Sequence, residues 1–406
     1  MAQVIKRNNK GGLSFLIRCS DGYDANGKQR KQSMTWTPPP GMSERKAEKE
    51  AEKEAIRFED AVNAGTIQDG NIKFQAFAEK WFVEYAEKNL KLKTWGEYKR
   101  RMGRVYTAIG HIKLRDLKTG HLNSFYANLQ EDGLNKHTGG KLSPSTVRTF
   151  HRIISSILGR AVKWGYIPYN PATHAELPKM DNKEAPHLDE QDARRLLELL
   201  HNEPIKYRVM ISFDLLSGLR RGELLGLRWQ DVDFETETIR IVQTSGYVPG
   251  HGVYVDTPKN RTSSRPLKLS RLAFMLLREY REWQDAQRDI CGNQWKDKDG
   301  RIFTGDEGAP LHPDSLTKWF ADFVKRVGLP RVHIHSLRHT YASLMIADGT
   351  PLVVVSRRLG HAQVSTTANI YAHVIQSADE KAAHITEKFA DVLTPPPAEL
   401  KPLKMA

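Results

Sequence analysis

A tyrosine late in the chain, Tyr371, stands ten residues after the histidine of a Leu-Gly-His turn in the stretch LGHAQVSTTANIYAHV (residues 359–374). The hydroxyl of tyrosine has an ordinary pKa of about 10, so it is mostly protonated near neutral pH. It becomes a useful nucleophile when a neighbouring group takes its proton and cations surround it. Taken alone, the residue is best interpreted as a packed aromatic, and a reactive role depends on the rest of the chain.

Three further stretches supply suitable partners, namely SGLRRGELLGLRW (217–229), TPKNRTSSRPL (257–267) and HIHSLRHTYAS (333–343). Together with the stretch 359–374 they resemble the motifs of the tyrosine recombinase family, specifically the integrases of temperate phages and conjugative transposons. The family order is Arg, Lys, His-x-x-Arg, His, Tyr, and here it falls on Arg220, Lys259, His335, Arg338, His361 and Tyr371. Each motif is weak by itself, but the complete ordered set is specific.

The resemblance implies an enzyme that cuts and rejoins DNA at attachment sites and so integrates and excises a mobile element or prophage. Tyr371 is then the nucleophile and forms a 3′-phosphotyrosyl link, which conserves the bond energy without ATP or metal. By the same resemblance His335 accepts the tyrosine proton, and Lys259, in a predicted turn between strands, protonates the leaving 5′ oxygen. No cofactor is implied.

Physical chemistry supports the two arginines in such a site. Cleavage of a phosphodiester builds negative charge on oxygen, and preorganised cations stabilise that charge. Arg220 and Arg338 each carry a planar fork that binds phosphate through two hydrogen bonds, whereas lysine offers a point charge. His361 is expected to hydrogen-bond the phosphate, and Arg221, outside the motif, is expected on the surface or in an ion pair.

Two residues keep more than one interpretation. Glu223, one turn after Arg220, either orients neighbouring side chains or is a surface carboxylate. His335 and His339 have the four-residue spacing of a zinc-binding helix, but Ser336 stands where a metalloprotease carries glutamate. We therefore expect no metal there and interpret His339 as a packed or capping residue.

Two other functions fit parts of this pattern. A type IB topoisomerase uses similar active-site residues to nick and reseal one strand, and a non-catalytic regulator could retain the fold. A separate N-terminal module favours recombination over topoisomerase activity, and the complete set of six residues argues against the regulator.

The distribution of charge predicts a nucleic-acid partner. The 406 residues have a net charge of +14, and residues 71–180 contain 19 Lys/Arg against 8 Asp/Glu, or +11. A second excess, 7 basic against 2 acidic residues, lies in residues 1–41. Two separate surfaces for a polyanion are implied. The resemblance assigns them to the core and arm sites of double-stranded DNA bound by a homotetramer, with an excisionase and a host DNA-bending protein left open.

The chain shows no run of 18 or more apolar residues and no closely spaced cysteines, since Cys19 and Cys291 lie far apart. These features predict no membrane partner, no structural metal and a reducing compartment. We expect a cytoplasmic, nucleoid-associated bacterial protein.

The elements that must position these residues form a multidomain, mostly α chain with small β-sheets. Turn signals and alternation predict a three-stranded sheet plus helix over residues 1–65, an arm-type DNA-binding domain by resemblance. Residues 71–180 show helical periodicity and predict a helical domain, which the resemblance implies is a SAM-like core-binding domain. Residues 187–393 are expected to be a mixed α/β catalytic domain, followed by a proline-rich tail over 394–406.

Capping signals refine three of the expected helices. Thr94 and Glu97 have the spacing of a capping box, and Ser143 followed by Pro144 predicts a second helix start. Ser377 and Glu380 predict a C-terminal helix with an apolar stripe. That helix packs either on its own domain or, as in related integrases, on a neighbouring subunit, which we favour.

Overall fold

The computed structural model describes residues 2–9, 12–23, 26–63, 70–136, 138–180, 185–257, 264–372 and 374. The chain divides into two compact units, Met1–Asn182 and Lys183–Ala406. Their boundary falls in residues 166–186, a stretch rich in proline and polar residues. Lys259 and the predicted C-terminal helix lie outside the described residues.

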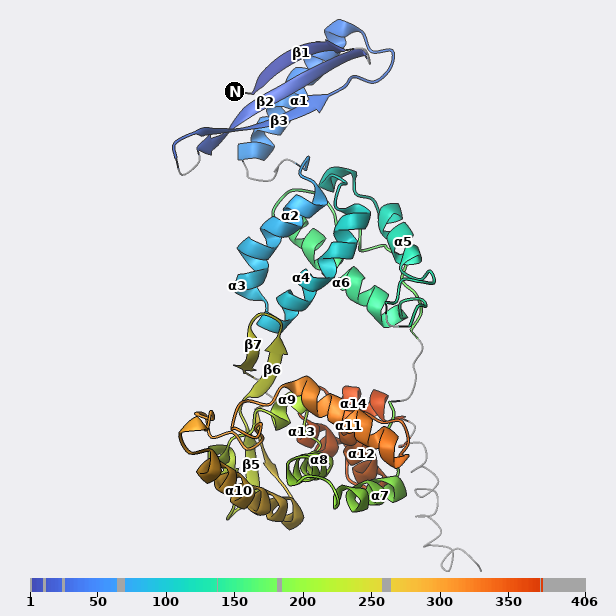
Figure 1. Ribbon diagram of the computed structural model, residues 1–406. Helices are drawn as coiled ribbons and strands as arrows, with labels where there is room; N and C mark the ends of the chain where they lie inside the picture. Colours follow the sequence, from blue (N-terminus) through green and yellow to red (C-terminus); the bar gives the residue numbers. More distant parts are fainter. Residues whose placement is uncertain are drawn as a thin grey trace, which may run out of the picture. The chain divides into compact units, whose positions relative to one another are not determined.

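The first unit begins with an antiparallel sheet in the order β1-β2-β3, with one helix against it (Figure 1). The elements are β1 (Gln3–Asn9), β2 (Gly12–Tyr23), β3 (Gln29–Trp36) and α1 (Glu44–Asn63). Strand alternation buries Phe15, Ile17 and Cys19 of β2. Helix α1 buries residues three or four positions apart, Ala47, Ala51, Ala55, Phe58 and Val62. The predicted three-stranded sheet plus helix is confirmed.

A helical bundle with its own apolar core completes the first unit. It comprises α2 (Phe74–Trp81), the π-helical turn η1 (Phe82–Ala86), α3 (Glu87–Asn89), α4 (Leu92–Ile109), the short η2 (Leu114–Asp116), α5 (Thr119–Asn128) and α6 (Pro144–Lys163).

The start of α6 is as predicted, because the Ser143 hydroxyl accepts a hydrogen bond from the Thr146 amide. The capping box at Thr94 is wrong: α4 begins earlier, after Lys91, without a side-chain cap. Glu97 instead pairs with Arg100 and Arg101 one turn further on.

The second unit combines helices with two small antiparallel sheets, so the mostly α fold class with small sheets is confirmed. One sheet has the order β4-β5-β8, and β6-β7 forms a separate hairpin. The strands are β4 (Val232–Asp233), β5 (Thr238–Ile241), β6 (Thr244–Val248), β7 (Gly252–Asp256) and β8 (Arg265–Lys268). The helices are α7 (Glu190–Leu200), α8 (Ile205–Ser217), α9 (Arg221–Leu224), α10 (Arg271–Cys291), α11 (Pro313–Val327), α12 (Ile334–Ala347), α13 (Leu352–Leu359) and α14 (Val364–Ile370), with the 3-10 turns η3 (Trp229–Asp231) and η5 (Gly292–Gln294).

Two glycine turns position the motif residues. Helix α12 packs against both α8 and α13 (Figure 1), and α8 and α13 end at Gly218 (φ 62°) and Gly360 (φ 65°). A Cβ at Gly218 would lie 2.3 Å from the Tyr341 ring, and one at Gly360 would lie 2.5 Å from the Arg265 guanidinium. Only glycine suits both the left-handed backbone and the close approach.

No helix within the described ranges combines the length and apolarity needed to cross a lipid bilayer.

Candidate functional site

Tyr371 lies at the end of α14, inside an apolar cluster of its own unit. Its side chain is 2 % exposed and packs with residues of α12 and α13, including Ala342, Ile346, Val355 and Leu359. The stretch between His361 and Tyr371 contains the helix α14 over residues 364–370. Burial raises the pKa of the Tyr371 hydroxyl to about 12, although Arg338 opposes the rise.

The hydrogen-bond partner of this hydroxyl is His339. Its Nδ1 lies 2.9 Å from the tyrosine oxygen, and the two rings have centroids 5.7 Å apart. His339 is packed between the rings of His335 and Tyr371, as expected, but it also binds the Tyr371 hydroxyl, a contact that the sequence did not indicate. The sequence places it on the same face of the predicted helix as His335, but only the fold brings the distant Tyr371 to it.

His335 lies one turn before His339, with its ring edge-on and 4.9 Å away between centroids. The residue is exposed, yet partial loss of hydration and the positive field of Arg338 lower the pKa of its ring. Among the described residues His335 makes no hydrogen bond to Tyr371, so the acceptor role implied for it by resemblance has no support in this geometry.

Arg220 is held by its own helix start and by the turn after α13. Its Nη1 donates to Glu223 at 2.7 Å, and its Nη2 donates to the carbonyl of Gly360 at 3.0 Å. These bonds fix the plane of the guanidinium while its side chain remains 36 % exposed. Arg220 is thus both preorganised and accessible to an anion.

Glu223 is buried, at 1 % exposure, so its interpretation as a surface carboxylate is wrong. Burial alone would raise the pKa of this carboxyl, but Arg265 and Arg220 outweigh burial and lower the pKa below its usual value. Glu223 therefore stays ionised and orients the two guanidiniums, as the other interpretation expected.

Arg338 lies deeper, at 2 % exposure, beneath the same turns. It donates to the carbonyl of Gly218 at 2.9 Å and to that of Leu359 at 2.6 Å. Burial and the like charge of Arg220 lower its pKa to about 9, which still leaves the side chain cationic at neutral pH.

Arg265 is a functional candidate that sequence reasoning missed. It is 8 % exposed, donates to the Arg358 carbonyl at 2.8 Å and lies 3.3 Å from Glu223. A signal was present, since Arg265 shares a strand face with the buried Leu267 two residues later. An arginine on a buried strand face needs a carboxylate partner, and Glu223 is that partner.

Three guanidiniums thus bind consecutive carbonyls at the end of α13. Arg265, Arg338 and Arg220 donate to residues 358, 359 and 360 in that order. The last carbonyls of a helix have no partner within it and carry partial negative charge, so cations there are stabilising. This end of α13 organises a basic cradle directly beside His361.

His361 follows this turn, and its Nδ1 lies 2.8 Å from the hydroxyl of the buried Thr367. Burial, followed by Arg338 and Arg220, lowers the pKa of the ring to about 4. A neutral ring that accepts the Thr367 hydroxyl at Nδ1 carries its hydrogen on Nε2, where it can donate to an anion.

Two remaining residues lie at the edges of this arrangement. Arg221 turns away to α11, where it pairs with Asp314 at 3.3 Å, as expected for a residue outside the motif.

Asp214 of α8 is fully buried, and neither carboxylate oxygen has a hydrogen-bond partner within the described chain. Burial raises the pKa of Asp214 well above its usual value, despite the nearby charge of Arg338.

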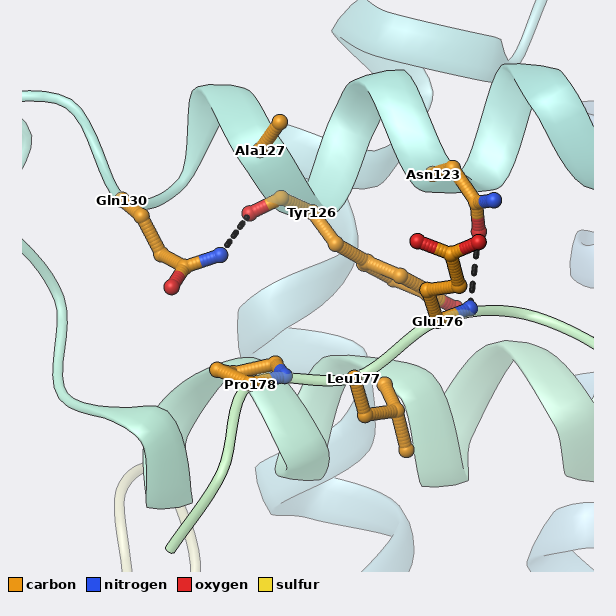
Figure 2. Close-up of a pocket in the computed structure, with 7 residues that line it drawn as sticks. All are labelled: Asn123, Tyr126, Ala127, Gln130, Glu176, Leu177 and Pro178. Atoms are coloured by element: carbon orange, nitrogen blue, oxygen red, sulfur yellow. Dashed lines mark hydrogen bonds between the residues drawn. The ribbon is translucent and has the colours of Figure 1, made fainter.

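The helical bundle of the first unit carries two adjoining hollows. One, of about 240 Å³, lies between α5 and residues 176–178, where Asn123 accepts a hydrogen bond from the Glu176 amide and Gln130 donates to the Tyr126 carbonyl (Figure 2). The other, of about 550 Å³, shares Leu177 and is lined along α6 by Arg148, His151, Arg152, Ser155 and Ser156. The second hollow has the hydroxyl and guanidinium donors that suit a phosphate.

Family models match both units. The Phage integrase family model matches residues 186–377, and the Phage integrase SAM-like domain model matches residues 73–177. Together they cover the site and the helical bundle.

Curated relatives extend the similarity to most of the chain. A tyrosine recombinase XerC-like protein of Caldanaerobacter subterraneus subsp. tengcongensis is 25 % identical over 394 residues, which cover 92 % of this chain and 96 % of that protein. The ICEBs1 integrase of Bacillus subtilis is 25 % identical over 272 residues, covering 67 % of this chain and 70 % of that protein.

Solved structures share the fold. The Tn1549 transposon integrase in complex with transposon right-end DNA superposes with a TM-score of 0.64 at 20 % identity, covering 78 % of this chain and 99 % of that one. A lambda integrase tetramer bound to a Holliday junction gives a TM-score of 0.52 at 15 % identity, covering 90 % of this chain and 94 % of that one.

Proposed function

The chain belongs to the tyrosine recombinase family, enzymes that transfer DNA strands in site-specific recombination, and on that premise we propose that it integrates a mobile element through a phosphotyrosyl bond on Tyr371. The observation that carries this proposal is the basic cradle at the end of α13, which lies in one unit with the buried tyrosine. Preorganised cations of this kind stabilise charge that develops on a reacting phosphate.

Each motif residue then has a role. Arg220 and Arg338 bind the nonbridging oxygens of the scissile phosphate, and His361 donates from Nε2 to the same group. Lys259 supplies the proton for the leaving 5′ oxygen. Glu223 keeps Arg220 in place, and His335, exposed at the rim, is proposed as a further hydrogen-bond donor to the phosphate.

Double-stranded DNA is the proposed substrate and partner. Residues 71–180 are proposed as the core-binding domain because they carry the charge excess of +11 and the phosphate-sized hollow along α6. Residues 1–65 are proposed as an arm-binding domain, residues 187–393 as the catalytic domain and residues 394–406 as a tail. Backbone contacts from lysine and arginine make such binding strong and salt-dependent.

The proposed assembly is a homotetramer on DNA. Its support is the fold shared with the lambda integrase, whose structures include a dimer and a tetramer on DNA. Assistance by an excisionase and a host DNA-bending protein, action in the bacterial cytoplasm, and excision as well as integration are part of the same proposal.

The test is covalent capture. Nicked duplexes are recovered from a random-sequence library by SDS-stable attachment to the full-length chain, with Tyr371→Phe as the matched control. We expect sequence-enriched adducts with wild type, none with the variant, and equal noncovalent binding of the recovered duplex by both proteins. Adducts formed by Tyr371→Phe would remove Tyr371 as the nucleophile. Binding without adduct by wild type would favour a regulator, and adducts without exchange of strands between duplexes would favour a topoisomerase.

A further inference from the structure

Within the described residues, the titratable side chain that hydrogen-bonds the Tyr371 hydroxyl is His339. His339 follows Arg338 on α12, and Tyr371 follows α14, so the two residues are 32 positions apart. Arg338 turns inward to the carbonyls of Gly218 and Leu359, which leaves the next position of the helix facing the tyrosine. The separation of 2.9 Å is that of a well-formed hydrogen bond.

The direction of this hydrogen bond follows from the ionisation of both groups. Burial raises the pKa of Tyr371 to about 12, so the phenol keeps its proton at neutral pH. Partial burial, with His335, Arg338, His333 and His187 around it, lowers the pKa of His339 to about 4. The ring is therefore neutral, and its Nδ1 has a lone pair that accepts the phenolic hydrogen.

We propose that His339 is a catalytic residue that holds the Tyr371 hydroxyl and accepts its proton as the tyrosine attacks phosphorus. This inference rests on the proposed recombinase function, and it assigns to His339 the step that the family resemblance implies for His335. A bound phosphodiester adds negative charge beside the arginines, which raises the proton affinity of His339 when the proton must move.

Atoms and charges balance in this step. The phenolic oxygen of Tyr371 forms a bond to phosphorus, and the bond from phosphorus to the 5′ oxygen breaks with its electron pair. The phenolic proton passes to Nδ1 of His339, which becomes an imidazolium, and Lys259 gives a proton to the 5′ oxygen. Rejoining reverses both transfers, so the imidazolium returns its proton to the departing tyrosine.

Two substitutions separate proton transfer from positioning. His339→Asn retains an acceptor oxygen near Nδ1 but takes no proton, whereas His339→Ala removes both functions. On the captured duplex we expect both variants to form adduct about 10² to 10⁴ times more slowly in a single turnover. Free imidazole should accelerate His339→Ala and have no effect on His339→Asn, whose side chain still fills the site. Adduct formation by His339→Asn within about threefold of wild type would reduce the role to positioning and overturn the proposal.

A sulfur-substituted DNA identifies which proton His339 handles. When sulfur replaces the bridging 5′ oxygen, the leaving thiolate needs no proton. We expect this substrate to restore cleavage by Lys259→Ala and to leave His339→Ala slow. Rescue of His339→Ala by the sulfur substrate would assign His339 to the leaving group and refute its role as acceptor.

Controls distinguish the failure of this inference from that of the proposed function. Thermal unfolding and DNA binding show whether each variant is folded, and His339→Asn serves if the alanine variant is not. If wild type forms no adduct, the proposed function fails. If wild type forms adduct and both His339 variants match its rate, only the assignment of His339 fails.

Discussion

The guanidinium of Arg265 lies 3.3 Å from the carboxylate of Glu223, and both side chains are nearly excluded from solvent. This pair joins strand β8, which contains Arg265, to helix α9, which contains Glu223. Glu223 also binds Arg220 at the start of α9. Arg265 reaches a third element through the carbonyl of Arg358 at the end of α13. One buried ion pair therefore ties together the elements that carry three motifs.

Arg265→Lys should weaken both the fold and the reaction, because one ammonium cannot reproduce the planar fork that reaches Glu223 and Arg358. We expect a loss of about 1 to 3 kcal/mol in the free energy of unfolding. Adduct formation should slow about tenfold or more with DNA affinity little changed. Chemical unfolding and single-turnover cleavage measure these effects, and the exposed Arg278→Lys is the control. Equal losses in both variants would deny Arg265 a special role.

Arg220→Lys should keep the positive charge but lose the bidentate grip on phosphate. The expected result is a cleavage rate at least about 10² times slower with a small change in DNA affinity. The neighbouring Arg221→Lys is a matched control, because Arg221 binds Asp314 of α11 instead. Rate constants from single-turnover assays decide between them, and an unchanged rate for Arg220→Lys would place the phosphate clamp elsewhere.

The depressed pKa values of His339 and His361, both about 4, predict a pH dependence of stability. Between about pH 6.5 and 4 the unfolded chain binds protons that the folded chain does not. Their stabilising contribution is therefore complete above about pH 6.5 and is lost as the pH falls toward 4, by at most about 3 kcal/mol for each ring. Urea unfolding at about pH 7.5 and pH 5 measures the loss, which should be smaller in His361→Asn. An identical pH dependence in that variant would contradict the prediction.

Asp214→Asn should be tolerated at neutral pH, because a buried carboxyl without a hydrogen-bond partner in the described chain is expected to be neutral already. We expect the free energy of unfolding to change by less than about 1 kcal/mol and cleavage to be retained. If Asp214 were instead an ionised partner of Arg338, its replacement would cost about 3 to 5 kcal/mol. Thermal and chemical unfolding at neutral pH separate the two outcomes.

The proposed core-binding surface predicts the response to salt. Arg152 and Lys99 are exposed on α6 and α4. Replacing either by glutamine should weaken binding of the captured duplex and of an unrelated duplex to the same extent. Each change should also lower by about one the slope of log affinity against log salt concentration. Fluorescence anisotropy from about 50 to 300 mM salt measures the slope, with the exposed Lys325→Gln as control. A slope equal to that of wild type would exclude these residues as phosphate contacts.

The sequence by itself determined the features that depend on local rules. Apolar periodicity predicted the helical bundle of residues 71–180, and Ser143 with Pro144 predicted the start of α6, because a capping side chain and a proline act within one turn. The order of the six motif residues along the chain was enough to indicate the family, and no distance in space was needed. Local rules failed at Thr94, where the helix begins earlier without a side-chain cap.

Only the tertiary structure decided how those residues meet. His339 contacts Tyr371 across 32 residues, and Arg265 contacts Glu223 across 42. Each contact depends on how α12, α13, α14 and β8 pack, and no local pattern encodes that geometry. Burial decided the ionisation as well: it turned Glu223 from a possible surface carboxylate into a buried one and left His339 neutral, because desolvation and neighbouring charge exist only once the chain is folded.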